Sequence, residues 1–210
     1  MFREVMSAER IGILISGRGS NMVALIDACK NQSLQAEVGL VISNIDSAPG
    51  LGKARDREIE TLSISHKART REDHDLEMVA AFRQRGVTLV CLAGYMRLVS
   101  AEVINAYKDR VLNIHPSLLP AFPGLDAQRQ ALEHGAKISG CTVHLVDEEL
   151  DHGPIILQRT VDVLEDDTVE TLSARILEQE HIAYPEAVAR VLSPGFKVEG
   201  RRTRVSPIQA

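Results

Sequence analysis

Short apolar runs alternate with amphipathic stretches along most of this chain, and this alternation constrains its fold more than any other feature. The runs are rich in β-branched residues and too short for helices, which is typical of buried strands. In the third helical stretch, Leu76, Val79 and Phe82 are three residues apart and are predicted to share a buried face. Strand–helix alternation predicts a parallel sheet with helices on both faces. The expected strands cover residues 11–16, 38–43, 61–65, 88–92 and 111–114, and the expected helices cover 22–30, 50–58, 72–85 and 101–107.

The pattern changes after Gly135. Residues 137–146 and 155–163 predict two further strands with no helix between them, so an antiparallel strand is expected late in the sheet. A long helix is expected over residues 169–192, because acidic residues and Thr168 suit its N-terminus. The sequence therefore predicts a Rossmann-like α/β fold with a mostly parallel sheet, helices on both faces and a late antiparallel strand.

We expect one domain over residues 1–193 and a separate tail over 194–210. A length of 210 residues suits a single domain with a sizeable core. The tail carries four basic residues against one acidic residue, and it is predicted to be a solvated, poorly ordered end. A phosphate-binding arm is the alternative. The basic residues of the tail are Lys197, Arg201, Arg202 and Arg204.

Composition excludes several classes of function. A net charge of −5 provides no basic field for polyanions, and 3% aromatic residues are too few to stack single-stranded bases. No nucleic-acid partner is therefore expected. No apolar run approaches the roughly 20 residues of a bilayer span, and no secretory signal is recognised, so we expect no membrane association and a cytoplasmic location. Three distant cysteines are predicted to be free thiols, with Cys91 in the core.

The loop after the first strand is a candidate phosphate site. Residues 16–21 read Ser-Gly-Arg-Gly-Ser-Asn, and a helix is expected to follow at once. A helix N-terminus offers free N–H groups and a partial positive charge, which suits a phosphate. The loop lacks the third glycine of the dinucleotide fingerprint and the Gly-Lys-Ser/Thr of a Walker loop. It therefore indicates a monophosphate site, or else a plain strand–helix turn capped by Ser20 or Asn21.

The end of the fifth strand carries a second candidate cluster. Asn113 and His115 lie two residues apart, so both side chains point to one face of the strand. An amide beside an imidazole suggests chemistry at a carbonyl, because both groups can stabilise a developing oxyanion. Asp151, in the turn between the late strands, is the candidate carboxylate that holds the imidazole and favours its cationic form. His144 is interpreted as a packed or rim residue. A metal site built from His115, His144, Asp151 and His152 is a weaker alternative, because no known ligand spacing supports it.

Several ordered segments resemble the phosphoribosylglycinamide formyltransferase family, whose members are folate-dependent enzymes of purine synthesis. They lie between about residue 10 and residue 193. The matching segments are residues 13–21 (ILISGRGSN), 92–97 (LAGYMR), 113–120 (NIHPSLLP) and 150–155 (LDHGPI), with Gln179-Glu180-His181 and Tyr184-Pro185 following.

The resemblance implies transfer of a formyl group from 10-formyltetrahydrofolate, as co-substrate and without a metal, to the amine of 5′-phosphoribosylglycinamide. The products are the formylated ribonucleotide and tetrahydrofolate, within de novo synthesis of IMP. Direct attack by the amine gives a tetrahedral oxyanion, which Asn113 and His115 stabilise. Hydrolysis of formyl-folate and a non-catalytic folate- or nucleotide-binding module are the rival functions. Monomer and homodimer both remain open.

The resemblance also implies roles for individual residues. Asn113, His115 and Asp151 form the catalytic group. Glu180 accepts hydrogen bonds from ribose hydroxyls, and Arg71 lies near the benzoyl-glutamate end of the folate; a solvated position is the alternative for both. Gly19, Ser20 and Asn21 hold the substrate phosphate together with Glu180 at the ribose, and the folate site comprises Arg71, Met96, Arg97, Leu98, Val99, Asn113, Asp147 and Leu150.

Three positions depart from the family pattern. His152 stands where some relatives carry glycine, and Asp126 and Gln128 stand where some carry histidine. All three flank the expected site, so the positioning of substrates is expected to differ there. The basic tail lies outside the resemblance.

Overall fold

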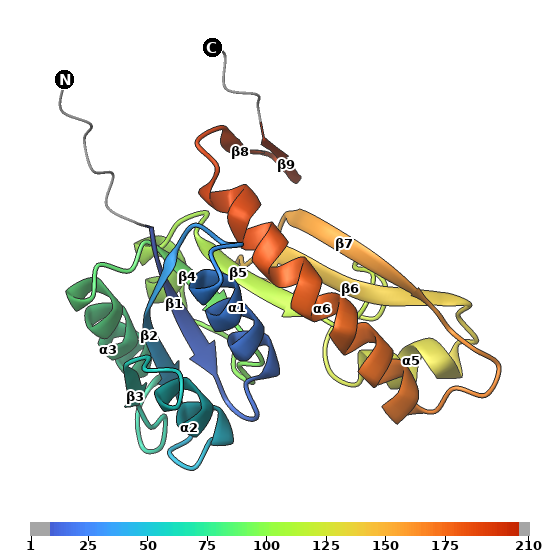
Figure 1. Ribbon diagram of the computed structural model, residues 1–210, viewed down its shortest axis with the longest axis horizontal. Helices are drawn as coiled ribbons and strands as arrows, with labels where there is room; N and C mark the ends of the chain where they lie inside the picture. Colours follow the sequence, from blue (N-terminus) through green and yellow to red (C-terminus); the bar gives the residue numbers. More distant parts are fainter. Residues whose placement is uncertain (1–8, 206–210) are drawn as a thin grey trace.

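The computed structural model describes residues 9–205, and its strands form one sheet in the order β3-β2-β1-β4-β5-β6-β7-β9-β8 (Figure 1). The first five strands along the chain are mutually parallel. Strand β6 is antiparallel to both of its neighbours, β5 and β7, and β9 pairs in parallel with β7. The strands are β1 (Arg10–Ile15), β2 (Glu37–Ser43), β3 (Thr61–Ser63), β4 (Leu89–Leu92), β5 (Val111–His115), β6 (Ile138–Leu145), β7 (Ile155–Asp162), β8 (Phe196–Glu199) and β9 (Arg202–Val205). The helices are α1 (Ser20–Lys30), α2 (Pro49–Arg55), α3 (Arg71–Gln84), α4 (Ala101–Ala106), α5 (Ala127–Glu133) and α6 (Val169–Leu192).

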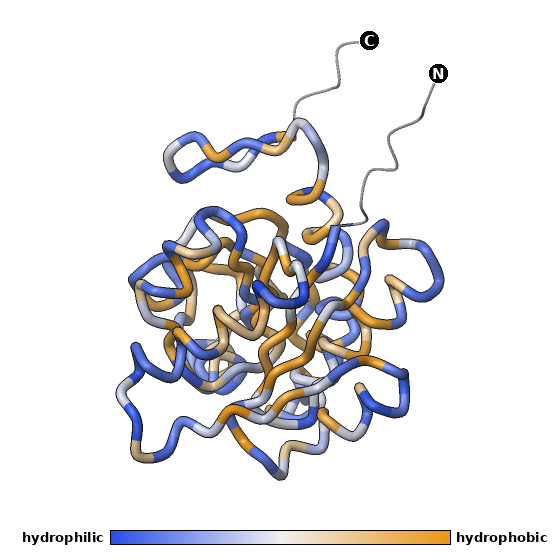
Figure 2. The backbone as a smooth tube through the Cα atoms, turned by 90° about the vertical axis from the view of Figure 1, so that its left-hand side faces the viewer, coloured by the Kyte–Doolittle hydropathy of each residue, from blue (hydrophilic) through white to orange (hydrophobic). Residues whose placement is uncertain are grey.

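Strand β1 lies inside the sheet, and its side chains alternate between two cores. Ile13 and Ile15 pack in the core that includes residues of α1 and α6, whereas Leu14 packs in the core that includes residues of α3 and α4. Gly12 also faces the second core, where a Cβ would stand 2.4 Å from Phe82 Cε1. The alternation follows from the two-residue period of a strand. Helices therefore cover both faces of the sheet, and the hydropathic colouring shows apolar strands running through the interior (Figure 2).

Helix α6 fixes the two halves of the sheet to each other. Thr168 caps its first turn by accepting from the Thr171 backbone N–H, and the Thr171 side chain returns the bond to Thr168. In the middle of the helix, the buried Tyr184 hydroxyl lies 3.0 Å from the Leu92 carbonyl oxygen and 3.1 Å from that of Leu112. Because these carbonyls belong to β4 and β5, the helix is anchored directly beneath the strand ends where polar residues gather.

The predicted fold class is confirmed, and most elements lie within two or three residues of their predicted bounds. Helix α5 was not predicted. The predicted buried face of α3 is wrong at Leu76, which is 49% exposed, while Met78 is buried in its place. Steps of three residues drift by about 60° around a helix of 3.6 residues per turn, so Leu76 turns away from the face that buries Phe82.

The tail differs from its prediction. Residues of the expected unstructured end form the antiparallel hairpin β8–β9, which pairs with β7 through Ile155 and Arg202. Residues 1–8 and 206–210 lie outside the described part of the chain, so the rest of the tail prediction is not addressed. The three cysteines are free, as predicted, and burial raises the pKa of the Cys29 thiol to about 11. Within residues 9–205, no helix is long and apolar enough to cross a membrane.

Candidate active site

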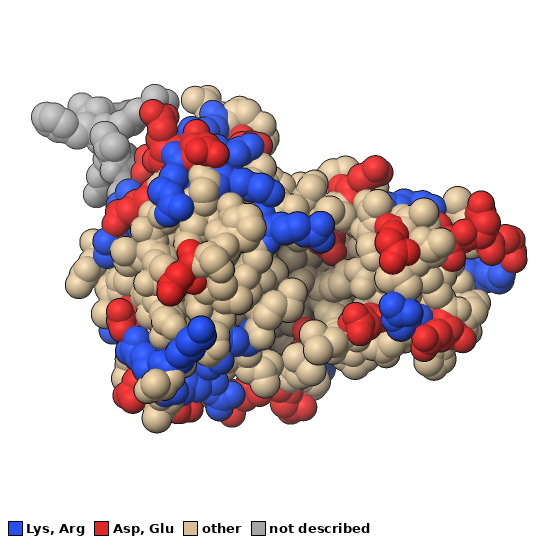
Figure 3. Space-filling view, turned by 90° about the horizontal axis from the view of Figure 1, so that it is seen from below, with Lys and Arg blue, Asp and Glu red and all other residues tan. Residues whose placement is uncertain are grey.

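Segments that follow β1, β4 and β5 meet the connection between β6 and β7 around a cleft of about 1020 Å³. Seen from below, the molecule is hollowed between a larger part and a smaller part that projects to the right, and Lys and Arg gather beside the hollow (Figure 3). Arg18, Arg71 and Arg97 line the cleft. A cleft of this size with cationic groups on its wall suits an anionic organic ligand.

The predicted catalytic residues are in contact. His115 and Asn113 end β5, and the β6–β7 connection folds over so that Asp151 Oδ2 lies 3.3 Å from His115 Nδ1. Asp151 Oδ2 also accepts from the Gly124 backbone N–H at 2.8 Å, and Asp151 Oδ1 lies 3.5 Å from Asn113 Nδ2. The Asp151 side chain is almost fully buried, although its backbone is left-handed, with φ of 51°. Aspartate tolerates this conformation better than most residues, and its partners hold it in place.

The ring of His115 has acceptor oxygens at both nitrogens. Nδ1 faces the Asp151 carboxylate, and Nε2 lies 2.9 Å from the Phe122 carbonyl oxygen. Only an imidazole that carries protons on both nitrogens can donate to both oxygens. To bind a substrate oxygen, the Nε2 N–H of His115 must give up its contact with the Phe122 carbonyl.

His144 is packed, as interpreted from the sequence, and it also belongs to the same cluster. The β5–β6 register places it directly opposite Asn113, and its Nε2 lies 3.2 Å from Asn113 Nδ2. Its Nδ1 donates to the Leu145 carbonyl at 2.8 Å, so Nε2 is free to accept. Burial is the main reason that the pKa of His144 is lowered below 6.5. The neutral ring therefore orients the Asn113 amide, and it leaves the second, weakly held N–H of Asn113 for a ligand.

The predicted phosphate loop turns tightly into the first turn of α1. Gly19 precedes α1 with φ of 65°, and Gly50 packs beneath the loop, where its N–H donates to the Gly17 carbonyl. Within the described residues, the Ser20 and Asn21 side chains make no capping bond to the first turn, so its N–H groups stay available. A plain capped turn is thus not what forms.

Glu180 reaches this loop from α6. Its carboxylate accepts from Asn21 Nδ2 at 2.6 Å and is only 7% exposed, which corrects the solvated alternative. Burial raises its pKa, and the Asn21 N–H partly opposes the rise. The buried Oδ1 of Asn21 has no hydrogen-bond partner within residues 9–205. A buried acceptor such as Asn21 Oδ1, beside a carboxylate that accepts one hydrogen bond, indicates a site where a polar ligand can donate.

The other predicted folate residues line the cleft. Met96 is 72% exposed, and Leu98 and Leu150 are about half exposed, so these apolar side chains stay accessible on the cleft wall. Arg71 lines the cleft at the start of α3, where its guanidinium lies 3.6 Å from Glu72. The remaining predicted residues on the wall are Arg97, Val99, Asn113 and Asp147.

The three departures from the family pattern have distinct positions. Asp126 and Gln128 line the cleft at the start of α5. His152 instead turns to Asp147, whose Oδ2 lies 2.8 Å from its Nδ1. In the part of the chain that the structure describes, no three His, Cys, Asp or Glu side chains are placed to hold a metal ion.

Comparison with known proteins decides the family. Residues 9–188 match the formyl transferase family. The chain is 44% identical to phosphoribosylglycinamide formyltransferase of Escherichia coli over 180 residues, which are 85% of each chain. The chain belongs to the phosphoribosylglycinamide formyltransferases. The family predicted from the sequence segments is thereby confirmed.

Solved structures of phosphoribosylglycinamide formyltransferases share this fold. Glycinamide ribonucleotide transformylase 1 from Symbiobacterium toebii superposes with a TM-score of 0.92 and 50% identity over 94% of each chain. A formyltetrahydrofolate deformylase from Pseudomonas syringae superposes with a TM-score of 0.89 but only 26% identity, over 95% of this chain and 66% of that one.

Some relatives are much longer. The trifunctional purine biosynthetic protein adenosine-3 of Drosophila melanogaster is 48% identical over 188 residues, which are 88% of this chain and 14% of that protein. The chain therefore spans about a seventh of the length of these relatives.

Proposed function

We propose that this chain transfers the formyl group of 10-formyltetrahydrofolate to the amine of 5′-phosphoribosylglycinamide in purine synthesis. The observation that carries the proposal is the buried contact between His115 Nδ1 and Asp151 Oδ2, 3.3 Å long, beside Asn113 on the wall of the cleft. Membership of the formyltransferase family supports the same reaction. The substrates are small molecules, and the location is cytoplasmic.

The reaction needs no covalent link to the protein. The neutral amine forms a bond to the formyl carbon, the bond from that carbon to the folate nitrogen breaks, and a proton passes from the amine to the departing nitrogen. Asn113 Nδ2 and cationic His115 donate to the formyl oxygen as negative charge develops there. Asp151 keeps His115 oriented and charged. Two substrates held side by side gain further rate from proximity.

The described residues fit both substrates. The first turn of α1 would hold the phosphate, and the buried carboxylate of Glu180 would accept from ribose hydroxyls. The exposed apolar side chains of Met96, Leu98 and Leu150 suit the flat rings of the folate. Arg71, on the same cleft, would lie near the folate carboxylates.

Hydrolysis of the same formyl-folate is the second candidate, because a formyltetrahydrofolate deformylase has a similar fold. The two reactions share the formyl donor and differ in the nucleophile. Measuring whether formyl-folate is consumed only in the presence of the ribonucleotide distinguishes formyl transfer from hydrolysis.

The test follows the absorbance of 10-formyltetrahydrofolate with and without the ribonucleotide. We expect consumption only when the ribonucleotide is present, together with its formylated product. His115→Ala and Asp151→Asn should each lower kcat by about 10²–10⁴-fold, whereas Asp166→Asn, at an exposed position, should not. Formate release without ribonucleotide would indicate a hydrolase. Tight binding without turnover would indicate a binding module, and wild-type rates in both variants would refute the catalytic assignment.

A further inference from the structure

The C-terminal hairpin β8–β9 reaches the loop that carries Asp151. The hairpin lies beyond residues 9–188, which match the family, and nothing in the proposed reaction uses it. Its turn, Gly200-Arg201, projects toward the β6–β7 connection. The connection and the hairpin are far apart along the chain but touch in the fold.

Arg201 holds His152 at two points. Its Nη1 lies 2.8 Å from His152 Nε2, and its Nη2 donates to the His152 backbone carbonyl at 2.5 Å. The same Nη1 also lies 3.3 Å from His152 Nδ1, so the guanidinium contacts both nitrogens of the ring. That Nδ1 lies 2.8 Å from Asp147 Oδ2. The three side chains therefore form one continuous set of contacts across the loop, from Arg201 through His152 to Asp147.

This set of contacts spans the residues that shape the site. His152 follows Asp151 directly, and Asp147 lies within the segment that lines the cleft. The Asp151 backbone is left-handed, and its carboxylate faces His115, so a contact that fixes the neighbouring peptide adds to the bond from the Gly124 N–H. The contact of Arg201 with the His152 carbonyl fixes the peptide on one side.

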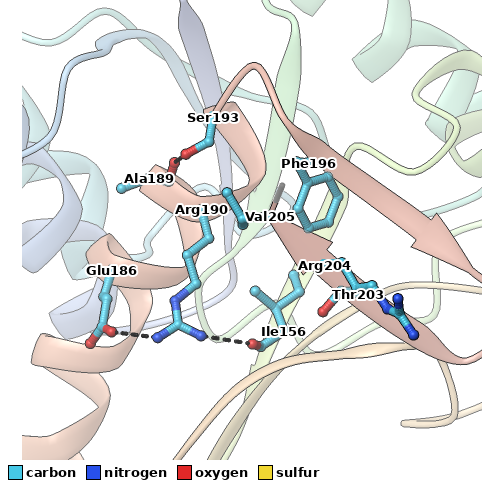
Figure 4. A pocket seen from close by; sticks show the side chains of 9 residues that line it. All are labelled: Ile156, Glu186, Ala189, Arg190, Ser193, Phe196, Thr203, Arg204 and Val205. Atoms are coloured by element: carbon cyan, nitrogen blue, oxygen red, sulfur yellow. Dashed lines mark hydrogen bonds and ion pairs between the residues drawn. The ribbon is translucent and has the colours of Figure 1, made fainter. Parts of the chain in front are cut away.

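The hairpin is itself anchored. Strand β9 pairs with the first residue of β7, and Thr203 Oγ1 donates to the Ile155 carbonyl at 2.9 Å. Phe196, Val205 and Ile156 face one another beside the end of α6, where Arg190 bridges Glu186 and the Ile156 carbonyl (Figure 4). The hairpin that carries Arg201 is thus packed against α6 and paired with β7.

We propose that Arg201 is a positioning residue that holds the Asp151 loop, through His152 and Asp147, in the shape that receives the folate. The proposal rests on the proposed function. It also accounts for His152, where some relatives carry glycine: in this chain the imidazole is the link between hairpin and loop. The ribonucleotide site, at the start of α1, is not part of this set of contacts.

The test compares Arg201→Ala with Arg204→Ala. Both variants remove one cation from the hairpin, but Arg204 pairs with Glu199 inside the hairpin at 3.3 Å. For Arg201→Ala we expect the KM for formyl-folate to rise about five-fold, as for the loss of a partly exposed charged contact, with the KM for the ribonucleotide and the Tm unchanged. Arg204→Ala should match the wild type. His152→Ala should raise the folate KM as well, and the double variant Arg201→Ala/His152→Ala should be no worse than the more affected single variant.

Calorimetric titration with tetrahydrofolate reads the same effect without turnover. If the wild type binds tetrahydrofolate but transfers no formyl group, the proposed function fails, and the Kd of each variant still tests the role of Arg201. Equal folate KM and Kd values for Arg201→Ala and Arg204→Ala would overturn the role. A rise in the KM of both substrates with a lower Tm would also overturn it, since that pattern reports general destabilisation.

Discussion

Glu180 is a buried carboxylate whose charged form the folded state disfavours. Helix α6 buries its carboxylate, and the Asn21 N–H is the one bond that it accepts within residues 9–205. Burial raises the pKa of Glu180 above its ordinary value of 4.5, so the folded state holds the proton more tightly than the unfolded state. Protonated Glu180 therefore stabilises the folded state fully when the pH lies below the pKa of Glu180 in the unfolded chain. This contribution to stability is lost as the pH rises through the higher pKa of Glu180 in the folded state.

Glu180→Gln should therefore raise Tm at pH 8 and change it little at pH 4, because the amide keeps an acceptor for Asn21 without burying a charge. The same change should raise the KM for the ribonucleotide about ten-fold, since a carboxylate accepts more strongly than an amide. Thermal melts followed by circular dichroism between pH 4 and 8, with initial rates, test both effects. Glu178→Gln, exposed on the same helix, is the control. A Tm gain of equal size at both pH values would contradict the linkage.

At the residue scale, the sequence predicted those site residues whose positions depend on local structure. Asn113 and His115 could be paired from their spacing on one strand, and the Gly19 loop from its place before a helix. His144 could not, because its role depends on the register between β5 and β6, which sets it opposite Asn113. The contact of Arg201 with His152 could not be predicted from local sequence patterns, because only tertiary packing brings the hairpin to His152.

At the scale of elements, the β6–β7 connection is closed at its base by a glycine. Leu145 N–H donates to the Pro154 carbonyl at 2.9 Å, and a Cβ on Gly153 would stand 1.9 Å from the Leu145 carbonyl oxygen. No side chain fits there unless the two strands separate. The close approach of the strands is what returns Asp151 to His115.

Gly153→Ala should open this base, lower the free energy of unfolding by about 1–3 kcal/mol as overpacking does, and reduce kcat because Asp151 is displaced. Gly52→Ala is the matched control: it lies within α2, where a Cβ would meet no atom within 4 Å, and it should stabilise the fold by about 0.5–1 kcal/mol. Urea denaturation and initial rates measure the two effects. A Gly153→Ala variant with wild-type stability and turnover would contradict this, because it would show that β6 and β7 can separate at Gly153 without displacing Asp151.

The more deeply a helix or strand is buried, the more clearly its sequence pattern predicts it. Strands of the parallel half are continuous apolar runs because both of their faces are covered, and such runs are visible in the sequence. Helix α5 has seven residues, of which only Ala127 and Ala131 are buried, so its pattern is too short to recognise. Strands β8 and β9 carry several charged residues at the edge of the sheet, and a charged edge resembles a solvated tail.

At the scale of the whole molecule, the residues of the candidate site are divided between the two halves of the sheet. Asn113 and His115 belong to the parallel half, whereas Asp151 and Glu180 follow the turn at Gly135. That turn is exposed, and Gly135 adopts a φ of 69° outside any strand. Exposed turns are the sites where chains best tolerate a break.

Fragments 1–135 and 136–210 should each be inactive and should recover turnover when they are expressed together, because β5 and β6 share a continuous ladder and a common core. The formyl-transfer assay on the separate and mixed fragments tests this expectation. A mixture whose second fragment carries Asp151→Asn should stay inactive. Turnover by fragment 1–135 alone would show that Asp151 and Glu180 are dispensable.

The division at β5 and β6 would also let the chain report when two other proteins come close together. If each fragment is fused to one of two other proteins, formyl transfer starts only when those proteins bring the strands together. In a cell that lacks its own source of the formylated ribonucleotide, growth without added purines would then report that the two fused proteins meet.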